Sequence, residues 1–156
     1  MKKFLTFVWA MFLSYLPGAT SALFPVTGEN GCWYDNLRHS ALTPDGIVFV
    51  IVWMVLYFLL GIALYRVIRA PRGGRRGRAY ALFGAHMILN AGWTYAFFGL
   101  HLADVSLVIC ALLLAVAIWM MRVFRRIDRT AGYLVWPYVI WTLFALYLNA
   151  VIVYLN

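Results

Sequence analysis

Acidic side chains are scarce in this sequence, with five Asp and Glu in 156 residues against 13 Lys and Arg. Charged residues of both signs make up 12% of the chain and hydrophobic residues 65%. Soluble proteins contain roughly 45–50% apolar residues. A water-soluble domain of this length cannot bury so much apolar side chain. The composition therefore excludes a soluble globular domain and indicates an integral membrane protein.

Charge is absent from five long stretches of the sequence, in which only His86 and His101 carry an ionisable group. A helix needs about 20 apolar residues to cross a hydrocarbon core of about 30 Å. Strands of a membrane barrel would alternate in polarity, whereas these stretches are apolar on every face. We predict an all-α membrane bundle of five transmembrane helices in one domain, residues 1–156. The stretches are Phe4–Phe24, Gly46–Tyr65, Ala79–Ala103, Val105–Met121 and Thr130–Asn156, and the helices are expected at about 4–24, 46–68, 79–101, 104–124 and 132–155.

The basic residues have a one-sided distribution. With five crossings, twelve of the 13 Lys and Arg fall on the side of the N-terminus, in residues 2–3, 66–78 and 122–129. The other side keeps Arg38, in a loop that also carries acidic residues. Because basic loops stay in the cytoplasm, we expect a multi-pass protein, of a bacterial cytoplasmic membrane, with its N-terminus inside and its C-terminus outside.

Two features of the basic segments have other interpretations. The tract Arg72–Arg78 resembles an RNA-binding segment, but a short basic loop between two spans more often sets topology and touches anionic lipid. We therefore expect no nucleic-acid partner. Lys2 and Lys3 followed by an apolar run also describe a secretory signal peptide. Its removal would leave four spans and break the charge pattern, so we interpret Pro17-Gly18 as a kink in the first helix.

Constellations for catalysis or metal binding are missing. Only two cysteines occur, Cys32 and Cys110, at different expected depths, so a disulfide between them is not expected. The spans contain no carboxylate, no metal-ligand spacing, no phosphate loop and no Ser/His/Asp set. We predict no metal site and no covalently bound cofactor, and no catalytic residue can be named. His86 is a candidate axial haem ligand, although no second ligand lies at a matching depth.

Aromatic residues are plentiful, with seven Trp, ten Tyr and eleven Phe. Some belong at the membrane interfaces, but three spans each carry a deeper aromatic residue followed four positions later by a second residue on the same helix face. Such faces suit a planar, mostly apolar ligand. The pairs are Trp53 and Tyr57, Trp93 and Phe97, and Trp141 and Ala145.

Polar residues on the third span face inward, because an amide or imidazole in lipid must find a partner. Asn90 precedes Trp93 by three residues, and His86 lies one turn earlier. Asn90 either bonds between helices or contacts the ligand. Small residues allow close helix approach, at Ser14, Gly18 and Ala22 and at Gly92, Ala96 and Gly99. The second set serves either internal packing or a homodimer interface.

Three motifs carry a resemblance to a known family. They are Trp33-Tyr34-Asp35-Asn36-Leu37, then Leu89-Asn90-Ala91-Gly92-Trp93 leading to Phe97-Phe98-Gly99, and Pro137-Tyr138-Val139-Ile140-Trp141 followed by 144–149. Over nearly its whole length the chain resembles the TspO/MBR family of tryptophan-rich sensory proteins and translocator proteins, which includes the peripheral benzodiazepine receptor.

The resemblance implies a five-helix bundle, usually a homodimer, that binds tetrapyrroles such as protoporphyrin IX and haem. Some members bind cholesterol or benzodiazepine-site ligands. It places the pocket beneath the first loop, lined by aromatic side chains. By motif position the lining here is Trp33, Tyr34, Trp53, Asn90, Trp93, Phe97, Trp141 and Ala145.

This sequence departs from the family pattern in three places. After Leu37 the family usually reads Lys-Pro-x-Trp-x-Pro-Pro, whereas residues 39–45 here lack the tryptophan and two of the prolines. His86 stands where members commonly have Gln. No Lys or Arg follows Tyr147, so the cholesterol-type motif is incomplete. These changes bear on ligand preference.

Three functions are compatible with the resemblance. The first is a membrane sensor or regulator that binds a tetrapyrrole. The second is an enzyme that breaks down protoporphyrin IX with light and oxygen, which needs no general acid or base. The third is a carrier of porphyrin or sterol, for which the chain lacks the inverted repeats that alternating access commonly uses.

Overall fold

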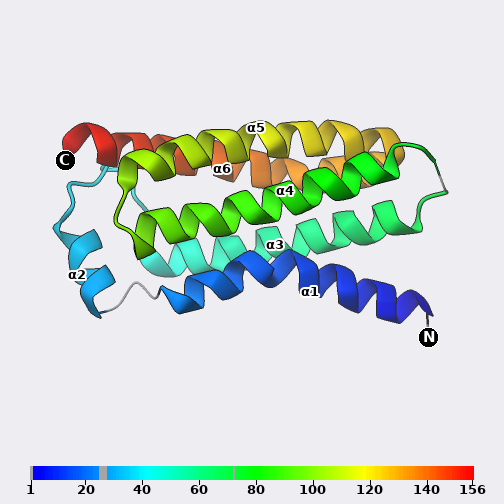
Figure 1. Ribbon diagram of the computed structural model, residues 1–156, viewed down its shortest axis with the longest axis horizontal. Helices are drawn as coiled ribbons and strands as arrows, with labels where there is room; N and C mark the ends of the chain where they lie inside the picture. The colour runs from blue at the N-terminus through cyan, green and yellow to red at the C-terminus, as the bar shows by residue number, and fades with distance from the viewer. Residues whose placement is uncertain (1, 25–27, 72) are drawn as a thin grey trace.

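The computed structural model describes residues 2–24, 28–71 and 73–156, and within them five long helices run side by side (Figure 1). A short helix, α2, lies across the end of the bundle where the C-terminus is found, and the N-terminus lies at the opposite end. The helices are α1 (Lys2–Leu23), α2 (Gly28–Asn36), α3 (Gly46–Arg69), α4 (Arg76–Thr94), the π-helix η1 (Tyr95–Gly99), α5 (Ala103–Ile127) and α6 (Arg129–Leu155).

Membrane-spanning character is clear for four of these helices. Among the described residues, α1, α3, α5 and α6 are long and apolar enough to cross a membrane. α4 is shorter, at 19 residues, and carries the buried polar side chains of His86 and Asn90. Its continuation η1 extends it to Gly99. The prediction of an all-α membrane bundle is confirmed, and α4 with η1 forms the fifth long helix.

The packing order follows from the helix contacts. α5 packs against α6 and α4, α1 packs against α3 and α4, and α3 packs against α6. Large side chains such as Leu60, Phe124 and Tyr138 are fully buried between them. The outer surface is also apolar, with Phe4, Ile88 and other large side chains exposed. A bundle that is apolar outside as well as inside is the pattern of helices surrounded by lipid.

Helix α2 differs from the expectation of a loop between the first two spans. Its nine residues are polar on average, so no apolar periodicity marks it in the sequence. So short a helix is marginal by itself, and it is stabilised by tertiary contacts. Within it the Asn36 amide donates to the Cys32 carbonyl at 2.8 Å.

The end of α4 widens into the π-helix η1. Its wider turn is closed by Leu100 N donating to Tyr95 O at 3.0 Å. His101 follows with a positive φ of 57°, and Leu102 N then donates to Ala96 O at 2.9 Å. These contacts make a tight connection between η1 and α5. π-Helical turns are rare and occur frequently at functional sites.

Candidate ligand-binding site

Helix α2 covers its end of the bundle with two aromatic rings. Trp33 stacks on His101 with ring centroids 4.3 Å apart and meets the edge of Phe97 at 5.3 Å. Tyr34 contacts Phe97 and Phe98 at 6.2 and 5.9 Å. Burial and the neighbouring Asp35 carboxylate raise the pKa of Tyr34. These two rings and their partners form a layer that we call the α2 cap.

Trp93 lies beneath the α2 cap and is fixed by a hydrogen bond. Its ring stacks on Phe97 at 5.3 Å, with 13° between the planes. Its Nε1 donates to Asn149 Oδ1 at 3.1 Å, and Ser106 Oγ donates to the same oxygen at 2.9 Å. Asn149 Nδ2 in turn donates to the Ala103 carbonyl at 2.9 Å. One amide on α6 therefore ties α4 and α5 to α6.

A second polar cluster lies deeper, around Asn90. Tyr57 Oη donates to Asn90 Oδ1 at 3.0 Å, and Asn90 Nδ2 donates to Tyr138 Oη at 2.6 Å. The ring of Trp53 contacts both tyrosine rings, at 5.5 and 5.8 Å. The interhelical role considered for Asn90 is therefore present. An amide can make about four hydrogen bonds, so capacity remains for a ligand.

His86 is enclosed next to this cluster. Its side chain is 0% exposed, and its ring lies 4.5 Å from that of Tyr138. Neither ring nitrogen has a hydrogen-bond partner among the described residues. Burying a polar group without a partner costs about 1–3 kcal/mol. Because the imidazole is fully buried and makes no hydrogen bond to the described residues, packing alone does not explain a histidine at this position.

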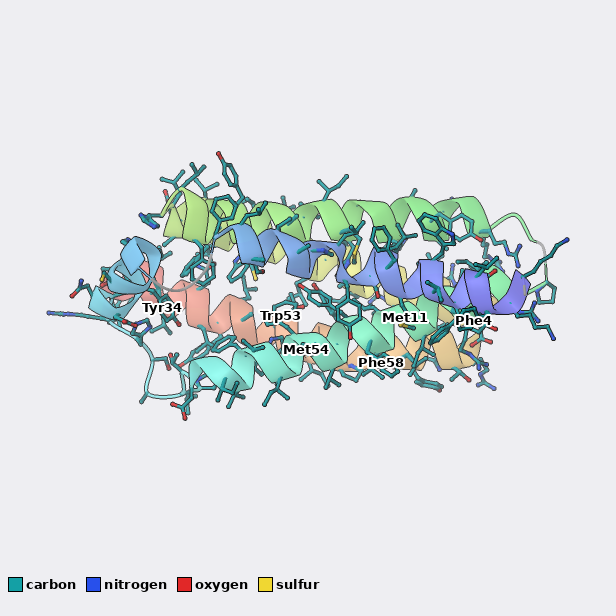
Figure 2. The ribbon with its side chains drawn as sticks, turned by 90° about the horizontal axis from the view of Figure 1, so that it is seen from below. Phe4, Met11, Tyr34, Trp53, Met54 and Phe58 are labelled. Carbon is teal, nitrogen blue, oxygen red and sulfur yellow. The ribbon has the colours of Figure 1, made fainter. Side chains whose placement is uncertain are left out.

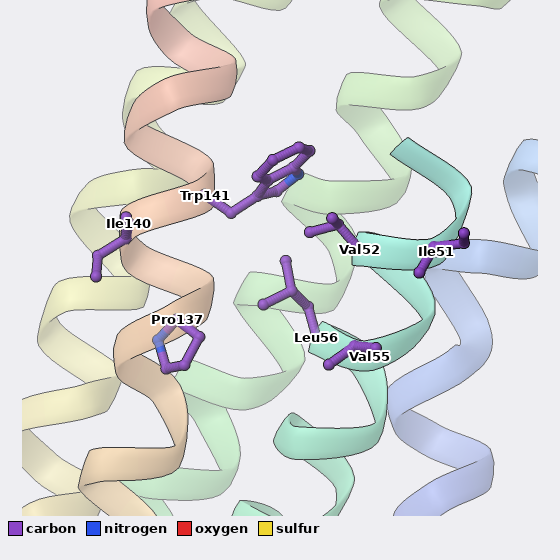
Figure 3. Close-up of a pocket in the computed structure, with 7 residues that line it drawn as sticks. All are labelled: Ile51, Val52, Val55, Leu56, Pro137, Ile140 and Trp141. Atoms are coloured by element: carbon purple, nitrogen blue, oxygen red, sulfur yellow. The ribbon is translucent and has the colours of Figure 1, made fainter. Parts of the chain in front are cut away.

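Trp141 borders a groove between α3 and α6 (Figure 3). Its ring meets the edge of Phe49 and the ring of Phe144, each at 5.5 Å. Its Nε1 is buried and has no partner among the described residues. The groove has a volume of about 400 Å³. Its lining residues are Ile51, Val52, Val55, Leu56, Pro137, Ile140 and Trp141.

The nine ligand-binding residues expected from the sequence are all buried or half-buried. Figure 2 shows Tyr34 beside α2 and Trp53 farther into the bundle. They fall into three groups. The groups are Trp33, Tyr34, Trp93 and Phe97 under the α2 cap; Trp53, Tyr57 and Asn90 around the amide; and Trp141 with Ala145 on α6.

Sequence reasoning assigned no role to Tyr138, Asn149 or Ser106, which complete the two polar clusters. A polar side chain inside an apolar span is a recognisable sign of an inward position, and Asn149 and Ser106 meet that description. Tyr138 does not stand out, because tyrosine is common in membrane helices.

The small residues proposed for a dimer interface have different surroundings. Ala96 is buried within the chain, and a side chain added at Gly99 would meet the Phe24 ring at 2.9 Å. A Cβ added at Gly92 would meet no atom within 4 Å in the part of the chain that the structure describes. Of the three, only Gly92 leaves space at the surface that a second copy could use.

Ionisable and sulfur ligands do not gather in this part of the molecule. Within residues 2–24, 28–71 and 73–156, no group of three or more His, Cys, Asp or Glu side chains could hold a metal ion. Cys32 is exposed and Cys110 is buried. The chemistry of the site is therefore that of aromatic faces with a few amide, hydroxyl and imidazole groups.

Comparison of the sequence with known proteins identifies a family. The TspO/MBR family model matches residues 6–155. A tryptophan-rich sensory protein of Cereibacter sphaeroides is 36% identical over 90% of this chain and 88% of its own length. The tryptophan-rich protein TspO of Chlorobaculum tepidum is 31% identical over 99% of this chain and 98% of its own length. The translocator protein of Ovis aries is 27% identical over 85% of this chain and 80% of its own length. The chain is a multi-pass membrane protein that belongs to the TspO/MBR family.

Proposed function

We propose that this chain is a membrane sensor or regulator that binds a tetrapyrrole, protoporphyrin IX or haem, beneath the α2 cap. The observation that carries the proposal is the cluster in which Asn90 joins two tyrosines and Trp53 packs on both. It combines flat apolar faces with a buried amide that retains hydrogen-bonding capacity. The name of one relative, tryptophan-rich sensory protein, supports a sensing role in the same family.

The surroundings suit a large flat ligand. Aromatic faces gain about 0.5–1.5 kcal/mol per ring pair beyond area burial. The Asn90 cluster is built from an amide, two phenols and an indole, so none of its members is a carboxylate that would repel propionate groups. Were haem the ligand, one ring nitrogen of His86 would be the candidate to hold its iron, because neither nitrogen has a hydrogen-bond partner among the described residues. A tetrapyrrole that took the place of a tyrosine as hydrogen-bond partner of Asn90 would alter the contacts among α3, α4 and α6. This supplies a route from binding to a conformational change.

A titration with protoporphyrin IX tests this function. The purified protein in nanodiscs is titrated while its tryptophan fluorescence is followed. We expect Asn90→Leu and Trp141→Phe each to weaken binding about tenfold, about 1.4 kcal/mol. The matched control is Trp119→Phe, because Trp119 is a tryptophan on α5 that is 54% exposed. Unchanged affinity in both site variants would remove this site from consideration.

We also propose that the protein has its N-terminus in the cytoplasm. Support comes from the distribution of charge over the bundle. Among the described residues every Lys and Arg except Arg38 lies at a helix end or connection opposite α2; Arg72 lies outside the described residues. Cationic ends remain on the cytoplasmic side, so α2 faces the exterior.

A further inference from the structure

The groove between α3 and α6 opens toward the outside of the bundle. Ile140 and Val55 on its rim are 61% and 51% exposed. The half-buried Trp141 lines its α6 side. Both helices belong to the membrane-spanning set. The mouth of the groove therefore faces lipid hydrocarbon, and every one of its lining residues is apolar or an indole. Only a molecule dissolved in the bilayer can reach it from that side.

Trp141 is held in place by packing alone. Its ring contacts are with Phe49 and Phe144, and its Nε1 has no hydrogen-bond partner among the described residues. The indole of Trp93, by contrast, is bonded to Asn149. Turning the Trp141 side chain therefore breaks no hydrogen bond.

The backbone of α6 near Trp141 is also easier to deform than that of a helix without proline. Pro137 lies inside α6 one turn before Trp141 and on the same groove wall. Proline lacks the N–H of a regular helix turn and disturbs the helix locally. Figure 3 shows both side chains facing α3 across the groove. The α6 side of the groove, where Pro137 and Trp141 lie, is thus the side whose conformation can change most easily.

Several contacts lie across the opposite route, from the aqueous end. Trp33 stacks on His101 in the α2 cap. The segment after α2 is tied to α6, because Arg38 N donates to Asn156 Oδ1 at 2.9 Å and Asn156 Nδ2 donates to the Arg38 carbonyl at 3.2 Å. Ser40 Oγ and Tyr147 Oη lie 3.1 Å apart in a further hydrogen bond. A ligand entering from water would have to break these contacts.

We propose that the α3/α6 groove is a lateral entrance, through which a flat apolar molecule dissolved in the bilayer reaches the Trp53 and Asn90 cluster while Trp141 moves aside. The identity of that molecule as a tetrapyrrole rests on the proposed function. The chemical argument is that an apolar macrocycle partitions into lipid, where the groove offers an apolar surface and a wall without polar ties.

Kinetics separate an entrance from a binding surface. Blocking an entrance slows association and dissociation together and leaves the dissociation constant in place. Two variants fill the groove mouth, Ile140→Trp on α6 and Val55→Phe on α3. Two matched controls make the same changes on exposed positions outside the groove, Leu143→Trp and Val50→Phe, where the native residues are 57% and 55% exposed.

The experiment mixes each protein in nanodiscs with lipid vesicles that carry protoporphyrin IX, and follows porphyrin emission by stopped flow. We expect both groove variants to slow association and dissociation about tenfold and to change the dissociation constant less than about twofold. Both controls should keep wild-type rates. Wild-type rates in the groove variants would overturn the entrance, as would weaker equilibrium binding without slower association. Absence of saturable binding to the wild-type protein would instead overturn the proposed function, and with it the entrance.

Discussion

Asp128 is the residue that joins α5 to α6, and it makes three contacts at once. Its carboxylate accepts from Arg66 Nε at 2.8 Å and from a second Arg66 nitrogen at 2.9 Å. It also accepts from Ala131 N at 2.7 Å, which caps the first turn of α6. Both side chains of the ion pair are partly exposed. A surface ion pair contributes about 0.2–1 kcal/mol, and a helix cap contributes about 1 kcal/mol.

Two substitutions at Asp128 separate these contributions. Asp128→Asn keeps a capping oxygen and loses the ion pair, so we expect a loss of up to about 1 kcal/mol of unfolding free energy. Asp128→Ala loses both and should cost about 1–2 kcal/mol. Thermal unfolding in detergent measures both values. Equal losses in the two variants would show that the cap contributes nothing.

The pH dependence of stability gives an independent check on the ion pair. Hydrogen bonds from Arg66 are the main cause that lowers the pKa of Asp128 below its usual 3.8. A lowered pKa in the folded state means that the stabilisation is present above pH 3.8 and is lost as the pH falls through the lowered value. Asp128→Asn should lack this acid-dependent loss.

Two glycines show how the fit between helices depends on position. Gly132 in α6 packs on α5 so closely that a Cβ would lie 2.7 Å from Arg125 Cα and 2.9 Å from Arg125 N. These are backbone atoms and cannot move without shifting the helix. A Cβ added at Gly84 in α4 would meet no atom of the described residues within 4 Å. The short connection at Asp128 therefore requires glycine at 132, whereas α4 does not require it at 84.

Gly132→Ala and Gly84→Ala should consequently change stability in opposite directions. We expect the first to lower the unfolding free energy by about 1–3 kcal/mol, because the two helices must separate. The second should raise it by about 0.5–1 kcal/mol, because alanine loses less backbone entropy in a helix. The same thermal unfolding assay compares them. A stabilised Gly132→Ala protein would contradict the close packing of α5 on α6.

The ends of the whole molecule differ in charge and in reactivity. α2 carries Cys32, which is exposed, whereas Cys110 is buried in α5. The connection before α4, at the opposite end, is rich in arginine and includes Arg75. With the orientation proposed above, the first cysteine faces the exterior and that connection faces the cytoplasm.

Labelling of intact cells tests this orientation. A membrane-impermeant maleimide should modify the wild-type protein at Cys32, and Cys32→Ser should abolish the labelling. A Cys32→Ser, Arg75→Cys double variant should react only after the membrane is opened. Labelling of the double variant in intact cells, together with no labelling of Cys32 in the wild-type protein, would reverse the orientation.

Much of the fold and part of the site follow from local sequence features. Uncharged runs long enough for the bilayer predict the long helices, because unsatisfied backbone groups are too costly in hydrocarbon for most other structures. Residues four apart predict shared faces, which is why Trp93 and Phe97 are found stacked. Helix α2 was missed because it depends on aromatic contacts with η1 rather than on its own periodicity.

By itself the sequence determined the helical class, the placement of charge at one end and the inward position of Asn90, because each follows from the cost of polar groups in lipid. The tertiary structure alone decided which partners the polar groups find. It paired Asn90 with Tyr57 and Tyr138, fixed Trp93 to Asn149, and left the Trp141 indole without a partner beside the α3/α6 groove. The physical reason is that these contacts join helices distant in sequence, so they depend on the rotation and spacing of whole helices, which no single segment encodes.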